Sequence, residues 1–454
     1  MAATTAAPRR SLFRHPDFVK LWTAATISLF GTQVSQIAIP VIAVLILNVP
    51  AYQVALLGTL EFLPFLLFTL PAGVWVDRLP RRRILISGDL GRALMLATIP
   101  IAYYFNALTI WQLYVVAFVT GIFTVFFDIA DQSYLPTVVE RDQLVDANGK
   151  LQASVSTAQV IGQPLGGGIV GLLTAPFAVL LDAVSYVASA LLIFSIRRQE
   201  RAGRAHSSGA AVTAQEVGEA PMSGASVAAE IAAEAAQPAS PERAGIRREV
   251  TECLRFVVGH PYLRSIAATT GSSNLFGSIA GAILPVFLYR DLGLTPEIVG
   301  LIGGGFGAGA LLGAVTSSRV AERIGIGRTI VGSIVISGVP QLLVPLANRE
   351  TALILIGGGG LITGWASVVY NVNQVSLRQS ICPEPMLGRM NATMRFIVWG
   401  TIPIGQIIGG IVATAFGTLA AIWLGAIAGL FAFLPVLFSP VRSLRRIADA
   451  QPEA

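Results

Sequence analysis

Long apolar runs separated by short polar turns make up most of this chain. A helix needs roughly 20 apolar residues to cross the hydrocarbon core of a bilayer. The runs therefore predict an all-α polytopic membrane protein with about twelve spanning helices in two sets of six. The predicted spans are Leu21–Leu47, Ala55–Val76, Ile84–Phe105, Ile110–Ala130, Gln152–Leu173, Phe177–Ile196, Ser265–Leu288, Val299–Val320, Thr329–Leu346, Ala352–Val375, Phe396–Phe416 and Leu419–Phe438.

The composition supports a membrane protein. Hydrophobic residues make up 54% of the chain and charged residues only 12%, whereas a soluble domain carries about 25% charged residues. The net charge of +6 resides in turns between apolar runs and not on one face of a soluble domain. We therefore expect these cations to contact lipid headgroups, and we expect no nucleic-acid partner.

The turns alternate in charge along the chain. One set is rich in arginine and lysine, and we call the side that these turns share the basic face. Its cations include Arg14, Arg78, Arg81, Arg82, Arg83, Arg141, Lys150, Arg197, Arg198, Arg323, Arg328, Arg378, Arg389, Arg442 and Arg445. By the positive-inside rule this face is cytoplasmic. The sequence thus predicts a multi-pass protein of the plasma (inner) membrane with both termini in the cytoplasm.

The other turns form what we call the neutral face. Four of them carry no charge: Asn48–Gln53, Asn106–Thr109, Thr174–Pro176 and Gly417–Thr418. The remaining two break the rule, because they contain Arg290, Asp291, Glu297, Arg349 and Glu350.

The chain divides into two spanning halves and a polar linker. Residues 1–198 and 246–454 are each expected to form a six-helix bundle. Residues 199–245 are rich in Ala, Glu, Ser, Gly and Pro, and such a segment cannot bury enough apolar surface to fold. We expect it to be a disordered cytoplasmic linker.

The two halves repeat one another in sequence. His15-Pro16 precedes the first span, and His260-Pro261 precedes the seventh. Residues in and near the fifth span recur 243 positions later, among them Asn148 as Asn391 and Gln163 as Gln406. Parallel six-helix repeats are typical of transporters that hold substrate between the repeats near mid-membrane.

The turn after the second span carries a recognisable spacing. It reads Gly73-x-x-x-Asp77-Arg78-x-x-Arg81-Arg82 and resembles the signature turn of the major facilitator superfamily, a large class of secondary transporters. The resemblance implies that Gly73, Asp77, Arg78 and Arg82 form a conformational latch between the halves. An alternative interpretation is an ordinary solvated basic turn. The proposed counterpart keeps Gly313 but has Ser317 in place of the Asp, which predicts a weaker second latch.

The fifth span contains a run of small residues. Gln163-Pro164-Leu165-Gly166-Gly167-Gly168 resembles the Gly-Pro-x-x-Gly-Gly signature of antiporter members of the superfamily, with Gln163 in place of the first Gly. The matched residues are Pro164, Gly167 and Gly168. Small residues also allow ordinary close packing of membrane helices, so tight packing is the competing interpretation.

Four charged residues fall within the third and fourth spans. Asp89 and Arg92 lie three residues apart, as do Asp128 and Asp131. A charge in hydrocarbon is costly unless it is paired or faces water. We therefore expect contact between these pairs, most plausibly Arg92 with Asp128 or Asp131. The cluster is either a proton relay or a structural salt bridge.

Uncharged polar residues provide candidates for a substrate cavity. Gln33 and Gln36 lie on the first span and Asn274 lies on the seventh, and the two spans occupy corresponding positions in the repeats. The sequence contains no nucleophile motif, cofactor loop or His cluster, so we expect no catalytic residue, no metal and no cofactor, and we do not expect an enzyme. Without a nucleotide-binding loop, ATP is not expected to drive the protein directly, and the resemblance to secondary transporters implies the proton gradient as the energy source.

Several segments resemble one branch of the superfamily, the branch of macrolide-efflux pumps and the enterobactin exporter. They are Phe13–Trp22, Asp142–Asn148, Leu181–Tyr186 and Leu387–Ala392. This resemblance implies proton-coupled efflux of amphipathic, antibiotic-like or siderophore-like small molecules by alternating access. The expected partners are then the lipid bilayer, such a substrate and protons. An importer or facilitator on the same fold is the main alternative, and a non-transporting membrane receptor is a more distant one.

Overall fold

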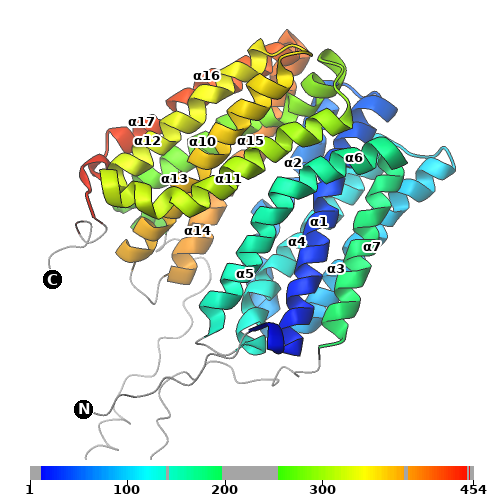
Figure 1. Ribbon diagram of the computed structural model, residues 1–454, viewed down its shortest axis with the longest axis horizontal. Helices are drawn as coiled ribbons and strands as arrows, with labels where there is room; N and C mark the ends of the chain where they lie inside the picture. Colours follow the sequence, from blue (N-terminus) through cyan, green and yellow to red (C-terminus); the bar gives the residue numbers. More distant parts are fainter. Residues whose placement is uncertain (1–11, 140–142, 197–253, 383–386, 447–448, 450–454) are drawn as a thin grey trace, which may run out of the picture.

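The computed structural model describes residues 12–139, 143–196, 254–382, 387–446 and 449. Throughout these residues the regular secondary structure is helical (Figure 1). The predicted linker, residues 199–245, lies outside the described residues, as do the first eleven residues of the predicted first bundle.

The first half contains six spans. In chain order they are α1 (Pro16–Val41) with a π-helical end at Ile42–Ile46, α2 (Ala51–Arg78), α3 (Arg81–Tyr104), α4 (Ile110–Val138), α5 (Leu144–Thr157) continuing into α6 (Gln163–Leu173), and α7 (Ala175–Phe194). The helix α7 packs against both α1 and α3, while α4 packs against α2 and α3.

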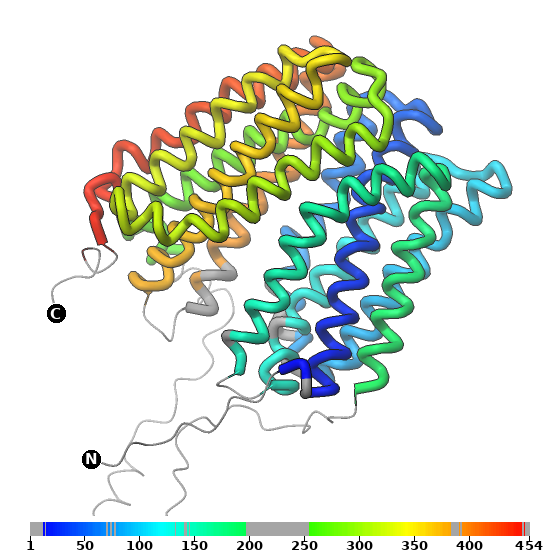
Figure 2. The backbone as a smooth tube through the Cα atoms, viewed as in Figure 1, coloured from blue at the N-terminus to red at the C-terminus, as the bar shows by residue number. Residues whose placement is uncertain are grey.

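The second half repeats this arrangement. Its elements are α10 (Pro261–Val286) with a π-helical end at Phe287–Asp291, α11 (Pro296–Ile324), α12 (Ile326–Gly338), α13 (Gly359–Ile381), α14 (Leu387–Trp399), α15 (Thr401–Phe416), α16 (Thr418–Leu430) and α17 (Leu434–Leu437). Short 3₁₀ and π segments join several of them into longer rods, which Figure 2 shows as continuous tubes.

The duplication is visible in helix lengths. Both α1 and α10 have 26 residues, and each begins at a Pro after a His and ends in a five-residue π-helical turn. They start 245 residues apart, and so do α2 and α11. This register corrects one expectation, because it pairs Asp77 with Glu322 and not with Ser317. The second basic turn therefore keeps an acidic residue, and the sequence alignment at an offset of 240 was wrong there.

The fifth span differs from a simple helix. A π-helical segment, Ala158–Gly162, separates α5 from α6, and the rod bends there (Figure 2). Eleven helices of the described chain are long and apolar enough to cross a membrane, and this rod is not one of them. Three glutamines and Pro164 lower its apolar content. Its place in the repeat nevertheless makes it the fifth of twelve spans.

The halves meet through two related helix crossings near the neutral face. In one, Gly167 of α6 lies against Pro296 and Gly300 of α11; in the other, Gly410 of α15 lies against Tyr52 and Ala55 of α2. These positions correspond to each other in the repeat. A side chain on Gly167 would collide with backbone atoms of α11, so glycine is what allows the backbones to approach so closely.

Two glutamines extend the same crossings toward the basic face. The side-chain amide of Gln163 lies against Gly303 of the second half, and that of Gln406 lies against Gly58 of the first half. From these contacts the long axes of the two halves diverge toward the basic face (Figure 1). The structure is therefore closed at the neutral face, and its apolar outer surface, for example Leu94, Leu172 and Leu191, is exposed as expected for lipid contact.

The motif in the fifth span provides a matched test of this crossing. We expect Gly167→Ala to weaken the contact by about 1–3 kcal/mol, because the new methyl group meets backbone that cannot move aside. Gly168 has open space around its Cβ position, so Gly168→Ala is expected to be neutral or stabilising by about 0.4–1 kcal/mol. Thermal unfolding of the detergent-solubilised variants measures both effects. Equal midpoints for the two variants would contradict this assignment of the motif.

Candidate functional site

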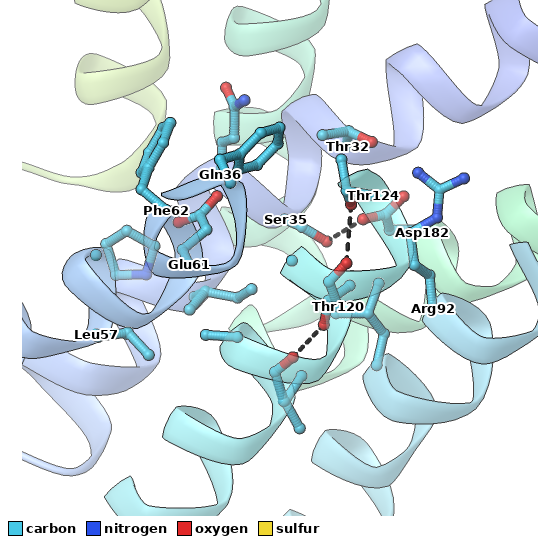
Figure 3. Close-up of a pocket in the computed structure, with 18 of the residues that line it drawn as sticks. Thr32, Ser35, Gln36, Leu57, Glu61, Phe62, Arg92, Thr120, Thr124 and Asp182 are labelled. Carbon is cyan, nitrogen blue, oxygen red and sulfur yellow. Dashed lines mark hydrogen bonds between the residues drawn. The ribbon is translucent and has the colours of Figure 1, made fainter. Parts of the chain in front are cut away.

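A cavity of about 720 Å³ lies between the two halves. This volume is in the range of pockets that bind drug-sized ligands. Most of its lining comes from α1, α2, α3, α4 and α7 of the first half, while α10, α14 and α15 contribute a few residues from the second. Figure 3 shows Glu61 of α2 and Asp182 of α7 among the polar side chains around it.

Glu61 is the most informative lining residue. It lies ten residues from the start of α2, about 15 Å along the helix and close to the middle of a membrane core roughly 30 Å thick. Among the described residues, none forms a hydrogen bond or ion pair with its carboxylate. The side chain is accessible only because it faces the cavity. The sequence did not predict this residue, and its available signal is a single acid between apolar neighbours in Leu60-Glu61-Phe62.

Asp182 also faces the cavity and is held by hydroxyl groups. Ser35 Oγ donates a hydrogen bond of 2.5 Å to Asp182 Oδ2, and Ser185 Oγ lies 3.2 Å from Oδ1. The residue is 1% exposed. Two hydroxyl donors offset part of the cost of burying a carboxylate. This arrangement links α7 to α1 at the wall of the cavity.

Asp128 and Asp131 line the cavity on the side of α4. In the described part of the chain neither forms an ion pair or hydrogen bond. The expected contact of Arg92 with one of them is therefore wrong, although all three residues border the same cavity. The two carboxylates remain available to a proton or a ligand.

Arg92 instead pairs along its own helix. Its guanidinium lies 2.6 Å from Asp89 Oδ1, and it is sandwiched between the rings of Phe127 and Tyr186 at 4.2 and 4.3 Å. Side chains three residues apart on a helix can contact each other directly. Each cation–π contact with an aromatic ring stabilises the bound guanidinium by roughly 0.5–2 kcal/mol. Arg92 is thus neutralised before any ligand enters. Asp89 is fully buried behind it and does not line the cavity.

The apolar part of the cavity is aromatic. Phe62 and Phe65 come from α2, and the ring of Phe65 lies 5.3 Å from that of Trp399, which comes from α14 of the second half. Phe127 and Tyr186 complete the set. Aromatic faces bind apolar rings and attract cations. The cavity therefore combines a rigid apolar wall with unpaired carboxylates.

The predicted polar residues of the cavity separate into two groups. Gln36 lines the cavity and lies 3.5 Å from Gln163. Gln33 does not, because it is buried against Gly162 of the π-helical turn. Asn274 does not either, since its amide donates to the carbonyl of Val398 within the second half. Those two expectations are corrected, and both residues support the backbone of broken helices.

The predicted latch is described only in part. The side chains of Asp77 and Arg78, and the surroundings of Gly73, lie outside the described residues. Arg82 donates to the carbonyls of Ile193 and Phe194 at the end of α7, so its contacts stay within the first half. A latch role for these four residues stays a prediction.

Comparison with known proteins is consistent with this architecture. A family model described as Major Facilitator Superfamily matches residues 21–277 and 266–453. The "Multidrug efflux pump Tap" of Mycolicibacterium fortuitum is 26% identical over 80% of both chains. "Macrolide efflux protein A" of Streptococcus pyogenes is 24% identical over 42% of this chain and 47% of its own.

A solved structure shares the fold at low sequence identity. The inward-facing crystal structure of a bacterial homologue of the iron transporter ferroportin covers 94% of this chain and 99% of its own, with a TM-score of 0.68 and 15% identity. Family match, duplicated six-helix halves and fold similarity agree: the chain belongs to the Major Facilitator Superfamily.

Proposed function

We propose that this protein exports amphipathic cations in exchange for protons. The observation that carries the proposal is the unpaired carboxylate of Glu61, near mid-membrane, in a cavity walled by aromatic rings. A lone carboxylate in a low-dielectric site favours a cation that brings its own apolar surface. The efflux relatives, at 24–26% identity, support export as the direction.

The other acids of the cavity supply a place for the proton. Asp128, Asp131 and Asp182 border the same space as Glu61. Protonation of one of them lowers the negative charge around the cavity by one unit, so a cation binds more weakly when the proton is present. Such mutual weakening is a negative coupling between two ligands. It provides a simple basis for exchange across the membrane.

Alternating access is the proposed route. The cavity lies between two halves that are closed at the neutral face and diverge toward the basic face. We place the basic face in the cytoplasm of a bacterial cell, where both termini then also lie. Rocking of the halves would expose the same cavity to the other side. An importer or facilitator would use the same motion, so the direction of proton-coupled flux decides between them.

Glu61→Gln tests cation recognition. The amide keeps the size of the side chain and removes its charge, so we expect binding of tetraphenylphosphonium to weaken at least tenfold, a loss of about 1.4 kcal/mol. Glu350→Gln is the control, because Glu350 is an exposed carboxylate in a turn of the neutral face. Isothermal titration calorimetry in detergent measures both. Unchanged affinity in Glu61→Gln, with normal folding, would rule out Glu61 as the cation site.

Asp128→Asn, Asp131→Asn and Asp182→Asn test proton coupling. We expect at least one of them to abolish cation-driven proton release from acidified inside-out vesicles, because the amide cannot bind the exchanged proton. Asp146→Asn is the control, since Asp146 pairs with Lys150 at 2.6 Å on the exposed start of α5. If proton release survives in all three cavity variants, the acids are structural and the coupling site lies elsewhere.

A further inference from the structure

At the neutral face, Arg290 of the second half contacts the first half. A guanidinium nitrogen of Arg290, in the π-helical end of α10, lies 3.1 Å from the carbonyl oxygen of Val44 and 2.9 Å from that of Val49. Both carbonyls belong to the turn that ends the first span. Arg290 is also one of the charged residues that break the alternation of basic and neutral turns. Its position offers a reason for that exception.

The turn that receives Arg290 is a helix end with carbonyls to satisfy. The π-helical segment Ile42–Ile46 ends the span, and Asn48 follows in the left-handed conformation at a φ of 47°. The last carbonyls of a helix lack partners within the helix and carry partial negative charge. A guanidinium is suited to such a site because it presents several donors in a fixed plane. Arg290 thus acts as a C-terminal cap supplied by the opposite half.

A second charged contact reinforces the same closure. The carboxylate of Glu297, at the start of α11, occupies the place where a Cβ of Gly171 would lie at the end of α6. Within its own half, Asp291 accepts a hydrogen bond from Thr418, which anchors the turn next to Arg290. Arg290 and Glu297 therefore contact the first half, and Asp291 stabilises the turn that carries Arg290.

The equivalent turn of the first half lacks these charged residues. Residues 245 positions earlier than Arg290, Asp291 and Glu297 are Leu45, Ile46 and Tyr52, none of which is charged. The first half therefore provides no cation to the turn after α10. In the part of the chain that the structure describes, the charged side chains that join the halves at the neutral face therefore come from the second half.

We propose that Arg290 is a latch that holds the neutral face closed and sets the ratio of the two access states. Both of its acceptors belong to the other half, so the contact exists only while the halves touch at this face. When they part, Arg290 and the two carbonyls return to water. A contact made in one state alone shifts the equilibrium toward that state. The inference depends on rocking of the halves and not on the identity of the substrate or on the coupling acids.

Distance measurements on the full chain test the latch. Spin labels are placed at Ala107→Cys and Glu350→Cys, on exposed neutral-face turns of opposite halves, in a chain with Cys253 and Cys382 changed to Ser. Pulsed electron double resonance in lipid nanodiscs then reports the ratio of open to closed distances. We expect Arg290→Ala to raise that ratio about tenfold, as expected for the loss of a charged hydrogen-bonded contact.

Two further variants make the test decisive. Arg349→Ala removes another neutral-face arginine, for which no contact between halves is present in the described chain, and is expected to leave the ratio unchanged. Leu45→Arg places a cation at the equivalent turn of the first half and is expected to lower the ratio. If Arg290→Ala unfolds the protein, Arg290→Gln replaces it. A rise of less than twofold without Arg290, or an equal rise in Arg349→Ala, overturns the latch.

Discussion

The cost of placing charge in hydrocarbon determines how this transporter is organised. An ionised carboxylate at mid-membrane must pair, find hydrogen bonds or face a water-accessible space. Asp89 pairs with Arg92, and Asp182 accepts hydrogen bonds from serines. Glu61, Asp128 and Asp131 have no such partner among the described residues and line the cavity. Because an unpaired carboxylate is unfavourable in hydrocarbon, these acids lie at the cavity, where a ligand can contact them.

Closure of the cavity depends on a different constraint, the distance between helix backbones. Glycines at 167, 300 and 303 allow α6 and α11 to touch, and the repeat places Gly410 and Gly58 at the related crossing of α15 and α2. These contacts are uncharged and nearly symmetric. The charged contacts are not, since Arg290 and Glu297 both come from the second half. Nearly symmetric packing thus brings the halves together at the neutral face, and the asymmetric charged contacts can favour one access state over the other.

Sequence patterns predicted the membrane fold and the two halves, because hydropathy and repeats are properties of the chain itself. They failed where the answer depends on which face of a helix a side chain occupies. Gln33 and Gln36 are three residues apart, yet only Gln36 lines the cavity. Arg92 was expected to pair across helices and pairs with Asp89 instead. Glu61 was not predicted, because its significance depends on facing the cavity without a partner among the described residues, which the sequence does not show.

The proposed exchange requires that the cavity bind an amphipathic cation through Glu61 and the aromatic wall. The most direct measurement is the position of bound tetraphenylarsonium, whose arsenic atom is located by anomalous scattering in a crystal of the complex. We expect arsenic inside the cavity, with Glu61 on one side and the rings of Phe65 and Trp399 on the other. Arsenic located instead in the separate groove beside Arg264, between α10 and α14, with the cavity empty, would contradict it.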